Sequence, residues 1–157
     1  DRIWLKKSFG TEVSTSTLVV RRTVLADLGG FDETLERGED YDLFLRLVAG
    51  WEVGFIDEPL VHYRVHGENA ARSDVLRRNF LEKRVLRRSW NALDLSARVA
   101  QSRYEWRLSD MNLAIGASLV RVGRGTLARR YFLKSARHAP TRVKPYWRWL
   151  LSFVGVA

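Results

Sequence analysis

Residues 37–50 read RGEDYDLFLRLVAG, and this stretch indicates more about the chain than any other. Its apolar residues recur at three- and four-residue spacing: Leu43, Phe44, Leu47 and Val48. The spacing predicts an amphipathic helix over residues 40–49, and Gly50 is a typical residue to end it. Three carboxylates stand where this helix begins, directly after a glycine.

These carboxylates, Glu39, Asp40 and Asp42, have two interpretations. Acids in the first turn complement the helix dipole, at about 0.3–1 kcal/mol each. Alternatively, one of them is a general base that takes the proton of a hydroxyl nucleophile, and the dipole keeps it ionised. Asp40-Tyr41-Asp42 is formally an Asp-x-Asp pair, with which many enzymes hold a divalent metal. Such a pair normally closes a hydrophobic strand, whereas this one opens a helix, so we reject it as the metal motif.

Short apolar runs around this helix predict three strands, over residues 18–20, 53–56 and 60–65. The third alternates strictly, which places His62 and Arg64 on its polar face, with His66 just beyond. An Arg on such a face can pair with a diphosphate, and a His can ligate a metal or position a leaving group. A half-exposed strand that shows polar side chains to water explains the same pattern.

Most of the chain after residue 72 has a helical pattern. We expect helices over these ranges: 73–90, 96–122, 126–138 and 143–153, in addition to a short early helix over 22–28. The second and third resemble a tetratricopeptide repeat in the spacing of four residues: Gly116, Ala128, Phe132 and Pro140. One such unit cannot bury its own faces, so we interpret it as a helical hairpin packed on its neighbours.

The charge is divided unevenly along the 157 residues. Residues 1–70 carry 8 Lys/Arg and 13 Asp/Glu, a balance of −5, whereas residues 71–157 carry 19 and 5, a balance of +14. The basic part suits an anionic partner such as phosphate, nucleic acid or a lipid surface. The chain has no cysteine, which excludes disulfides, thiolate metal sites and cysteine nucleophiles. It shows no signal peptide and no run of about 18 apolar residues.

Five short motifs follow one another in a specific order. They are Ser16-Thr17-Leu18-Val19-Val20-Arg21-Arg22, Gly29-Gly30-Phe31-Asp32-Glu33, Gly38-Glu39-Asp40-Tyr41-Asp42-Leu43, Asp57-Glu58-Pro59-Leu60 and Tyr63-Arg64-Val65-His66. This succession, over residues 14–70, resembles the second half of family 2 glycosyltransferases. The resemblance implies an α/β chain, a partial GT-A fold that lacks its N-terminal Rossmann-like half and carries an all-α extension. Residues 1–70 would be the catalytic part and residues 71–157 the basic helical extension.

The resemblance also assigns roles to residues. It implies that Asp40 is the catalytic base and that Glu39 beside it orients the acceptor. Ser16 and Thr17 match a loop that lines the acceptor side, where relatives often carry glycines. Arg64 is a candidate diphosphate contact, and His66 matches a histidine that completes the site of a divalent metal, Mg²⁺ or Mn²⁺.

The family's nucleotide-binding strands and metal-binding carboxylates precede this region, and nothing in the chain replaces them. We therefore expect a fragment or one part of a split enzyme, with little or no transferase activity by itself. The implied reaction is inverting transfer of a sugar from a nucleotide-diphosphate sugar to a saccharide or lipid-linked acceptor. The setting would be bacterial cell-envelope polysaccharide or glycolipid synthesis.

The basic, Trp-rich tail suits an anionic membrane surface, and residues 144–151 fit that hypothesis best. A packed terminal helix with Arg on its solvent side explains them equally well. We expect a cytoplasmic protein, peripheral at the inner face of the membrane. Two alternatives are a basic nucleic-acid-binding protein and a helical adaptor. Neither accounts for the ordered motifs in residues 14–70, and no base-reading motif is recognisable.

Overall fold

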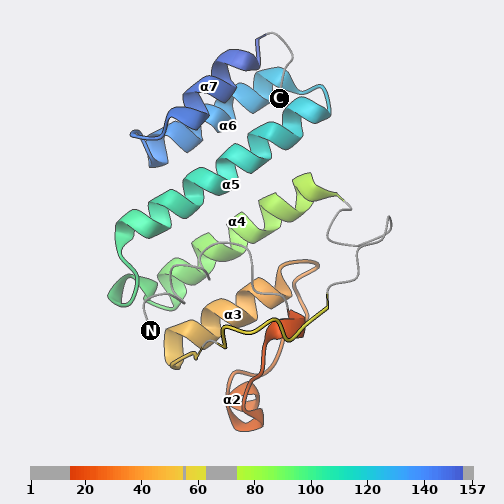
Figure 1. Cartoon of the computed structure of the whole chain (residues 1–157), viewed down its shortest axis with the longest axis vertical. Coiled ribbons are helices and arrows are strands. Elements are labelled where there is room, and N and C mark those ends of the chain that lie inside the picture. The colour runs from red at the N-terminus through yellow and green to blue at the C-terminus, as the bar shows by residue number, and fades with distance from the viewer. Residues whose placement is uncertain (1–14, 55, 63–73, 154–157) are drawn as a thin grey trace. The chain divides into compact units, whose positions relative to one another are not determined.

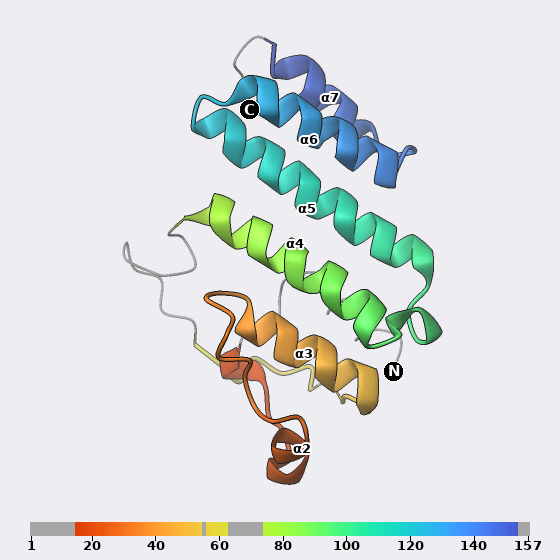
Figure 2. The same cartoon turned by 180° about the vertical axis from the view of Figure 1, so that it is seen from behind.

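The computed structural model describes residues 15–54, 56–62 and 74–153 (Figures 1 and 2). The chain forms two compact units. Unit 1 comprises residues 1–73 and 84–99, and unit 2 comprises residues 74–83 and 100–157. Helix α4, Val75–Ala92, therefore gives its first part to unit 2 and its remainder to unit 1.

Unit 1 is organised around helix α3. Its described elements are η1 (Thr15–Thr17), α2 (Arg22–Asp27), α3 (Glu39–Gly50), the later part of α4 and η3 (Leu95–Ala97). Six residues of α3 are buried, four of them consecutive, so the helix is enclosed on most of its circumference: Asp42, Leu43, Phe44, Leu45, Leu47 and Val48. Apolar residues of α4 and of the segment after it are buried in the same unit: Val85, Leu86, Trp90, Leu95 and Val99. The core of unit 1 is thus apolar, with one carboxylate, Asp42, among its buried side chains.

Unit 2 is a stack of helices. It contains the first part of α4 together with α5 (Gln101–Arg121), α6 (Gly125–His138) and α7 (Val143–Leu151). Helices α5, α6 and α7 lie side by side in both views (Figures 1 and 2). The five buried residues of its core cluster are Leu113, Ile115 and Leu119 from α5, and Ala128 and Phe132 from α6.

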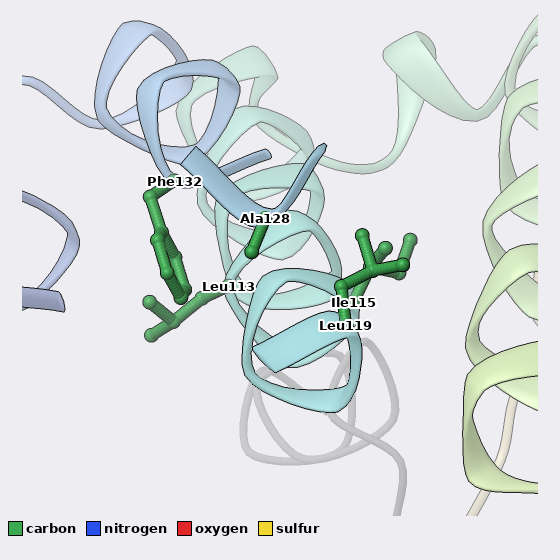
Figure 3. Packing of buried hydrophobic residues seen from close by; sticks show 5 residues of the cluster. All are labelled: Leu113, Ile115, Leu119, Ala128 and Phe132. Carbon is green, nitrogen blue, oxygen red and sulfur yellow. The ribbon is translucent and has the colours of Figure 1, made fainter. Parts of the chain in front are cut away.

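The contact between α5 and α6 depends on a glycine. A Cβ atom placed on Gly116 would lie 2.5 Å from Cε1 of Phe132, much closer than any real carbon contact. Phe132 is 1% exposed and Ala128 is fully buried, and both point from α6 toward α5 (Figure 3). The small residue on α5 therefore allows the Phe132 ring to pack directly against the helix backbone. The predicted helical tail is confirmed, and Gly116 and Phe132 of the repeat-like spacing meet where α5 and α6 pack.

The expected α/β fold, a partial GT-A domain with strands, is wrong for the part of the chain that the structure describes. The described residues form helices and irregular segments, and none is in a strand. Leu18-Val19-Val20 follows η1 in irregular backbone with Val19 97% exposed. Ile56, Leu60 and Val61 are also exposed in irregular backbone. Residues 55 and 63–65 of the expected strands lie outside the described residues.

The physical reason lies in what a strand requires. A helix satisfies its own backbone hydrogen bonds, whereas a strand needs a second strand beside it. In the described ranges no neighbouring segment pairs with residues 18–20 or 56–62. A short apolar or alternating run alone therefore does not make these segments strands.

Candidate functional site

The carboxylates after Gly38 stand in the first turn of α3. Gly38 precedes the helix with φ of 84°, in the left-handed region that favours glycine, and it is buried. Its carbonyl accepts a hydrogen bond from the Asp42 N–H at 2.9 Å, which begins the helix. Glu39 and Asp40 are both exposed. The glycine therefore turns the chain sharply enough for these two acids to reach solvent at the helix start.

Asp40 and Asp42 have opposite environments although only one residue separates them. Asp40 is exposed, and Oδ1 accepts a hydrogen bond from the backbone N–H of Tyr41 at 2.7 Å. Asp42 is 2% exposed, and both its oxygens accept hydrogen bonds from arginines. Arg46 Nε donates to Oδ2 at 2.8 Å, and Arg88 Nη2 donates to Oδ1 at 2.7 Å. Of the two aspartates, Asp40 is the one available to a substrate.

The two arginines continue this network beyond Asp42. Arg46 donates from Nη1 to the carbonyl of Leu28 and from Nη2 to the carbonyl of Gly30, each at 2.8 Å. Arg88 Nη2 also donates to Oδ2 of Asp32 at 3.1 Å. We call Asp32, Asp42, Arg46 and Arg88 the arginine network. It fixes the Gly29-Gly30 turn to α3 and α4 through charge-assisted hydrogen bonds, which are stronger than neutral ones.

The network shifts the proton affinity of two of its members. Hydrogen bonds from the side chain and backbone of Thr34, and then from Arg88, lower the pKa of Asp32 below its ordinary value of 3.8. Hydrogen bonds to Asp42 and then to Asp32 raise the pKa of Arg88. Both groups are therefore held in their charged forms.

An open pocket of about 360 Å³ lies beside this network. The residues that line it come from the glycine turn, α3, α4 and the residue after α4: Leu28, Gly29, Gly30, Phe31, Asp32, Asp42, Arg46, Arg88, Ser89, Ala92 and Leu93. The charged groups at this pocket are paired with one another. Glu39 and Asp40 do not line it.

The other predicted site residues either lie away from the pocket or fall outside the described residues. Ser16 and Thr17 are exposed in η1, and neither lines the pocket. Glu39 and Asp40 share one helical turn, so the structure brings these two together. Arg64 and His66 lie outside the described residues, and their roles stay predictions.

The implied divalent metal is not accommodated by the residues described here. Within residues 15–54, 56–62 and 74–153, no three His, Asp or Glu side chains gather closely enough to hold an ion. Both oxygens of Asp42 are already bound by arginine, so Asp40-Tyr41-Asp42 does not present a free carboxylate pair. This agrees with rejecting it as the metal motif.

Sequence reasoning missed the arginine network. One part of it had a local signal, because Asp42 and Arg46 are four residues apart on a helix, a spacing that favours ion pairs. Arg88 had no such signal, because it lies 46 residues from Asp42 and stands in the stretch expected to be an extension. Its contacts place the later part of α4 with unit 1.

Comparison with known families gives a match to the first part of the chain. A family model described as "Glycosyltransferase like family 2" matches residues 3–90, more than half of the chain. The chain therefore belongs to the family 2 glycosyltransferase-like proteins. The matched region includes Asp40, Asp42 and Arg88, and it ends before α5. No curated protein and no solved structure matches the chain.

Two further predictions concern the end of the catalytic part and the relation of the chain to a membrane. The match passes residue 70, the expected end of the catalytic part, and that boundary stays a prediction. Among the helices in the described ranges, none has both the length and the apolar character needed to cross a bilayer.

Proposed function

We propose that this chain carries the base-catalysis part of an inverting glycosyltransferase, with Asp40 as the general base. The observation that supports the proposal is the contrast within one helical turn. Asp40 is an exposed carboxylate at the N-terminus of α3, inside the family match, whereas Asp42 is buried between two arginines.

The proposed reaction needs this carboxylate because a sugar hydroxyl is a weak nucleophile. Asp40 takes the proton of the acceptor hydroxyl while the oxygen attacks the anomeric carbon of the donor. The bond from that carbon to the nucleoside diphosphate breaks, and the diphosphate leaves with the bonding electrons. Attack opposite the leaving group inverts the configuration. Glu39, exposed in the same turn, orients the acceptor.

The remaining assignments belong to the same proposal. Ser16 and Thr17 contact the acceptor side, and Arg64 pairs with the donor diphosphate. A divalent metal, Mg²⁺ or Mn²⁺, would be held by His66 and by carboxylates beyond the described residues. The acceptor is a saccharide or lipid-linked sugar of bacterial cell-envelope polysaccharide or glycolipid synthesis, reached from the cytoplasmic side. These assignments rest on the ordered motifs and on the family.

Replacing Asp40 by Asn tests the proposal, because Asn keeps the shape and cannot take the proton. In the complete transferase to which we expect this chain to belong, kcat should fall about 10²–10⁴-fold, the usual contribution of a general base. Release of nucleoside diphosphate from UDP-, GDP- and dTDP-sugars, with cell-envelope saccharide acceptors, measures turnover. The acid limb of the pH profile of kcat should disappear in the variant.

Asp27→Asn is the matched control, since Asp27 is also exposed and lies at the end of another helix of unit 1. It should leave turnover unchanged. The thermal midpoints of both variants should equal that of the parent. Turnover by Asp40→Asn within threefold of the parent, with the pH profile intact, would remove Asp40 from the base role.

A further inference from the structure

The outward side of α7 is almost entirely apolar. Six residues of α7 and of the turn after it are exposed: Val143 by 72%, Tyr146 by 43%, Trp147 by 62%, Leu150 by 50%, Leu151 by 36% and Phe153 by 59%. At 100° per residue they all fall on one side of the helix axis. We call these residues the α7 face. Scattered apolar residues are ordinary on a protein surface, but a continuous face that includes Trp, Tyr and Phe marks an interaction site.

Packing on the opposite side fixes the direction in which this face points. Pro145 is fully buried and Ser152 is 6% exposed. Trp149 packs against the core cluster of unit 2, and its ring meets that of Phe153 edge-on at 5.0 Å. Helix α7 is therefore anchored by one side, and the α7 face is a built surface of unit 2.

The polar groups at the α7 face already have contacts within the chain. The Tyr146 hydroxyl donates a hydrogen bond to the carbonyl of Pro140 at 3.2 Å. The guanidinium of Arg129 lies 4.4 Å from the centre of the Phe153 ring, a cation–π contact at the margin of the face. A partner of this face therefore needs an apolar interior into which the side chains can insert. It does not need a specific pattern of hydrogen-bonding groups.

The charge around the face is predominantly positive. After Asp110 the chain contains nine Lys/Arg and no Asp or Glu. Four of these cations are exposed on α6 and α7: Arg130, Lys134, Arg137 and Lys144. Two anions contact the same helices, Asp110 through Arg142 and Glu105 through His138, so cations predominate around the face. An apolar face with aromatic residues in such a setting is complementary to an anionic lipid surface. Nucleic acid would match the charge but would leave Val143, Leu150 and Leu151 in water.

We propose that the α7 face docks unit 2 on an anionic lipid bilayer, with α7 lying in the plane of the headgroups. Trp147 and Leu150 enter the acyl boundary, and Lys144 pairs with lipid phosphate. A helix of nine residues is too short to span a bilayer, so it lies on the surface. The inference rests on the proposed function only for the lipid-linked acceptor that such docking would bring near.

Co-sedimentation of the full chain with vesicles tests the proposal without measuring sugar transfer, so it can fail while the proposed function stands. Vesicles of phosphatidylcholine are compared with vesicles that also contain phosphatidylglycerol. We expect binding to the anionic vesicles that weakens as salt rises, and at least tenfold weaker binding to the neutral ones. Trp147→Gln with Leu150→Gln should weaken binding about tenfold, and Lys144→Gln about fivefold.

Two valines supply the matched control. Val143 belongs to the α7 face and is 72% exposed, whereas Val122 follows α5 and is 58% exposed. Val143→Gln should weaken vesicle binding about two- to threefold, and Val122→Gln should leave it unchanged. Far-UV circular dichroism and the thermal midpoint of each variant show whether unit 2 stays folded.

Three results would each overturn the proposal. One is equal binding to neutral and anionic vesicles, and another is equal loss in Val143→Gln and Val122→Gln. The third is self-association of the lipid-free chain that disappears in the Trp147→Gln and Leu150→Gln variant while vesicle binding persists. That last result would assign the α7 face to a second copy of the chain.

Discussion

The two units of this chain hold their helices in place by different interactions. In unit 1, α3 is tied to the turn before it by Asp42 and two arginines: Arg46 also donates to backbone carbonyls of the turn, and Arg88 also donates to Asp32. In unit 2, α5 and α6 meet mainly through apolar contact, with the Phe132 ring lying on the backbone at Gly116. A buried polar contact joins them as well, since the Ser135 hydroxyl donates to the carbonyl of Ser109 at 2.8 Å. The unit that carries the candidate catalytic residue thus fixes a loop by charge, whereas the α5–α6 contact of the other unit depends mainly on shape.

This difference matters for function because directional bonds fix the position of a loop more precisely than apolar packing does. Apolar packing is strong but has no preferred direction, whereas charge-assisted hydrogen bonds fix both distance and angle. The carbonyls of Leu28 and Gly30 are held by Arg46, which stands on the same helix as Asp40. The arginine network therefore keeps the glycine turn and the N-terminal part of α3 in a fixed relation.

Removing the charge of Asp42 should produce the largest effect on stability. Asp42→Asn keeps the size of the side chain but replaces the carboxylate by a neutral amide. The guanidinium groups of Arg46 and Arg88 then lose their shared ion-pair partner. We expect unit 1 to lose about 2–4 kcal/mol, toward the lower end because Arg88 is half exposed. Amide hydrogen exchange of the full chain, compared between α3 and the α5–α6 pair, localises the loss.

Asp40→Asn is the control for that experiment, because it makes the same substitution two positions away on an exposed residue. It should change the exchange of α3 amides by less than about 0.5 kcal/mol. Equal destabilisation by both variants would show that Asp42 has no special structural role. It would also end the distinction between a structural and a reactive aspartate in this turn.

Gly116→Ala tests the packing of unit 2 and should have the next largest effect. Alanine favours a helix over glycine, but its Cβ would overlap the Phe132 ring, which is buried and has little space to move. We expect a net loss of about 1–3 kcal/mol in the exchange of α5 and α6 amides. Phe132→Leu in the same chain should recover part of it, because the smaller side chain makes room for the added methyl group.

Gly123→Ala makes the same exchange of residues where no atom lies within 4 Å of the new Cβ. Its cost comes only from the backbone, since Gly123 has φ of 75°. Phe132→Leu should therefore give it no recovery. Recovery of both glycine variants by Phe132→Leu would contradict a specific contact between Gly116 and the ring.

Much of the helical structure could be predicted because its signal is local. The apolar spacing gave α3 to within one residue at each end, and α6 and α7 began within one residue of their expected starts. Expected helix 96–122 was longer than α5, because residues 95–97 form a separate 3-10 turn. The strands failed for the converse reason, since a short apolar or alternating run, such as the one that begins at Leu60, cannot specify a partner strand elsewhere in the chain.

The candidate site was predictable only in outline. The motif placed Glu39 and Asp40 at the start of a helix, and the structure has them in the first turn of α3. Which aspartate is buried could not be read from Asp40-Tyr41-Asp42, because the decision depends on Arg88, far along the chain. Periodicity describes one helix at a time, whereas burial of a carboxylate depends on what a second helix contributes.

The smallest of the three effects concerns pH and separates the units most cleanly. Asp32 has a pKa below its ordinary 3.8 in the folded chain, because Thr34 and Arg88 donate hydrogen bonds to its carboxylate. It therefore stabilises unit 1 above the ordinary pKa, and this contribution is lost as pH falls through the lowered one. Asp32→Asn should thus weaken the exchange protection of α3 at pH 6, and the difference from the parent should shrink as the pH is lowered below 3.8.

Amides of α5 and α6 serve as the internal control, since their protection should be the same in parent and variant. A difference at α3 that stays constant with pH would mean that Asp32 acts through its shape, and the arginine network would then end at Asp42.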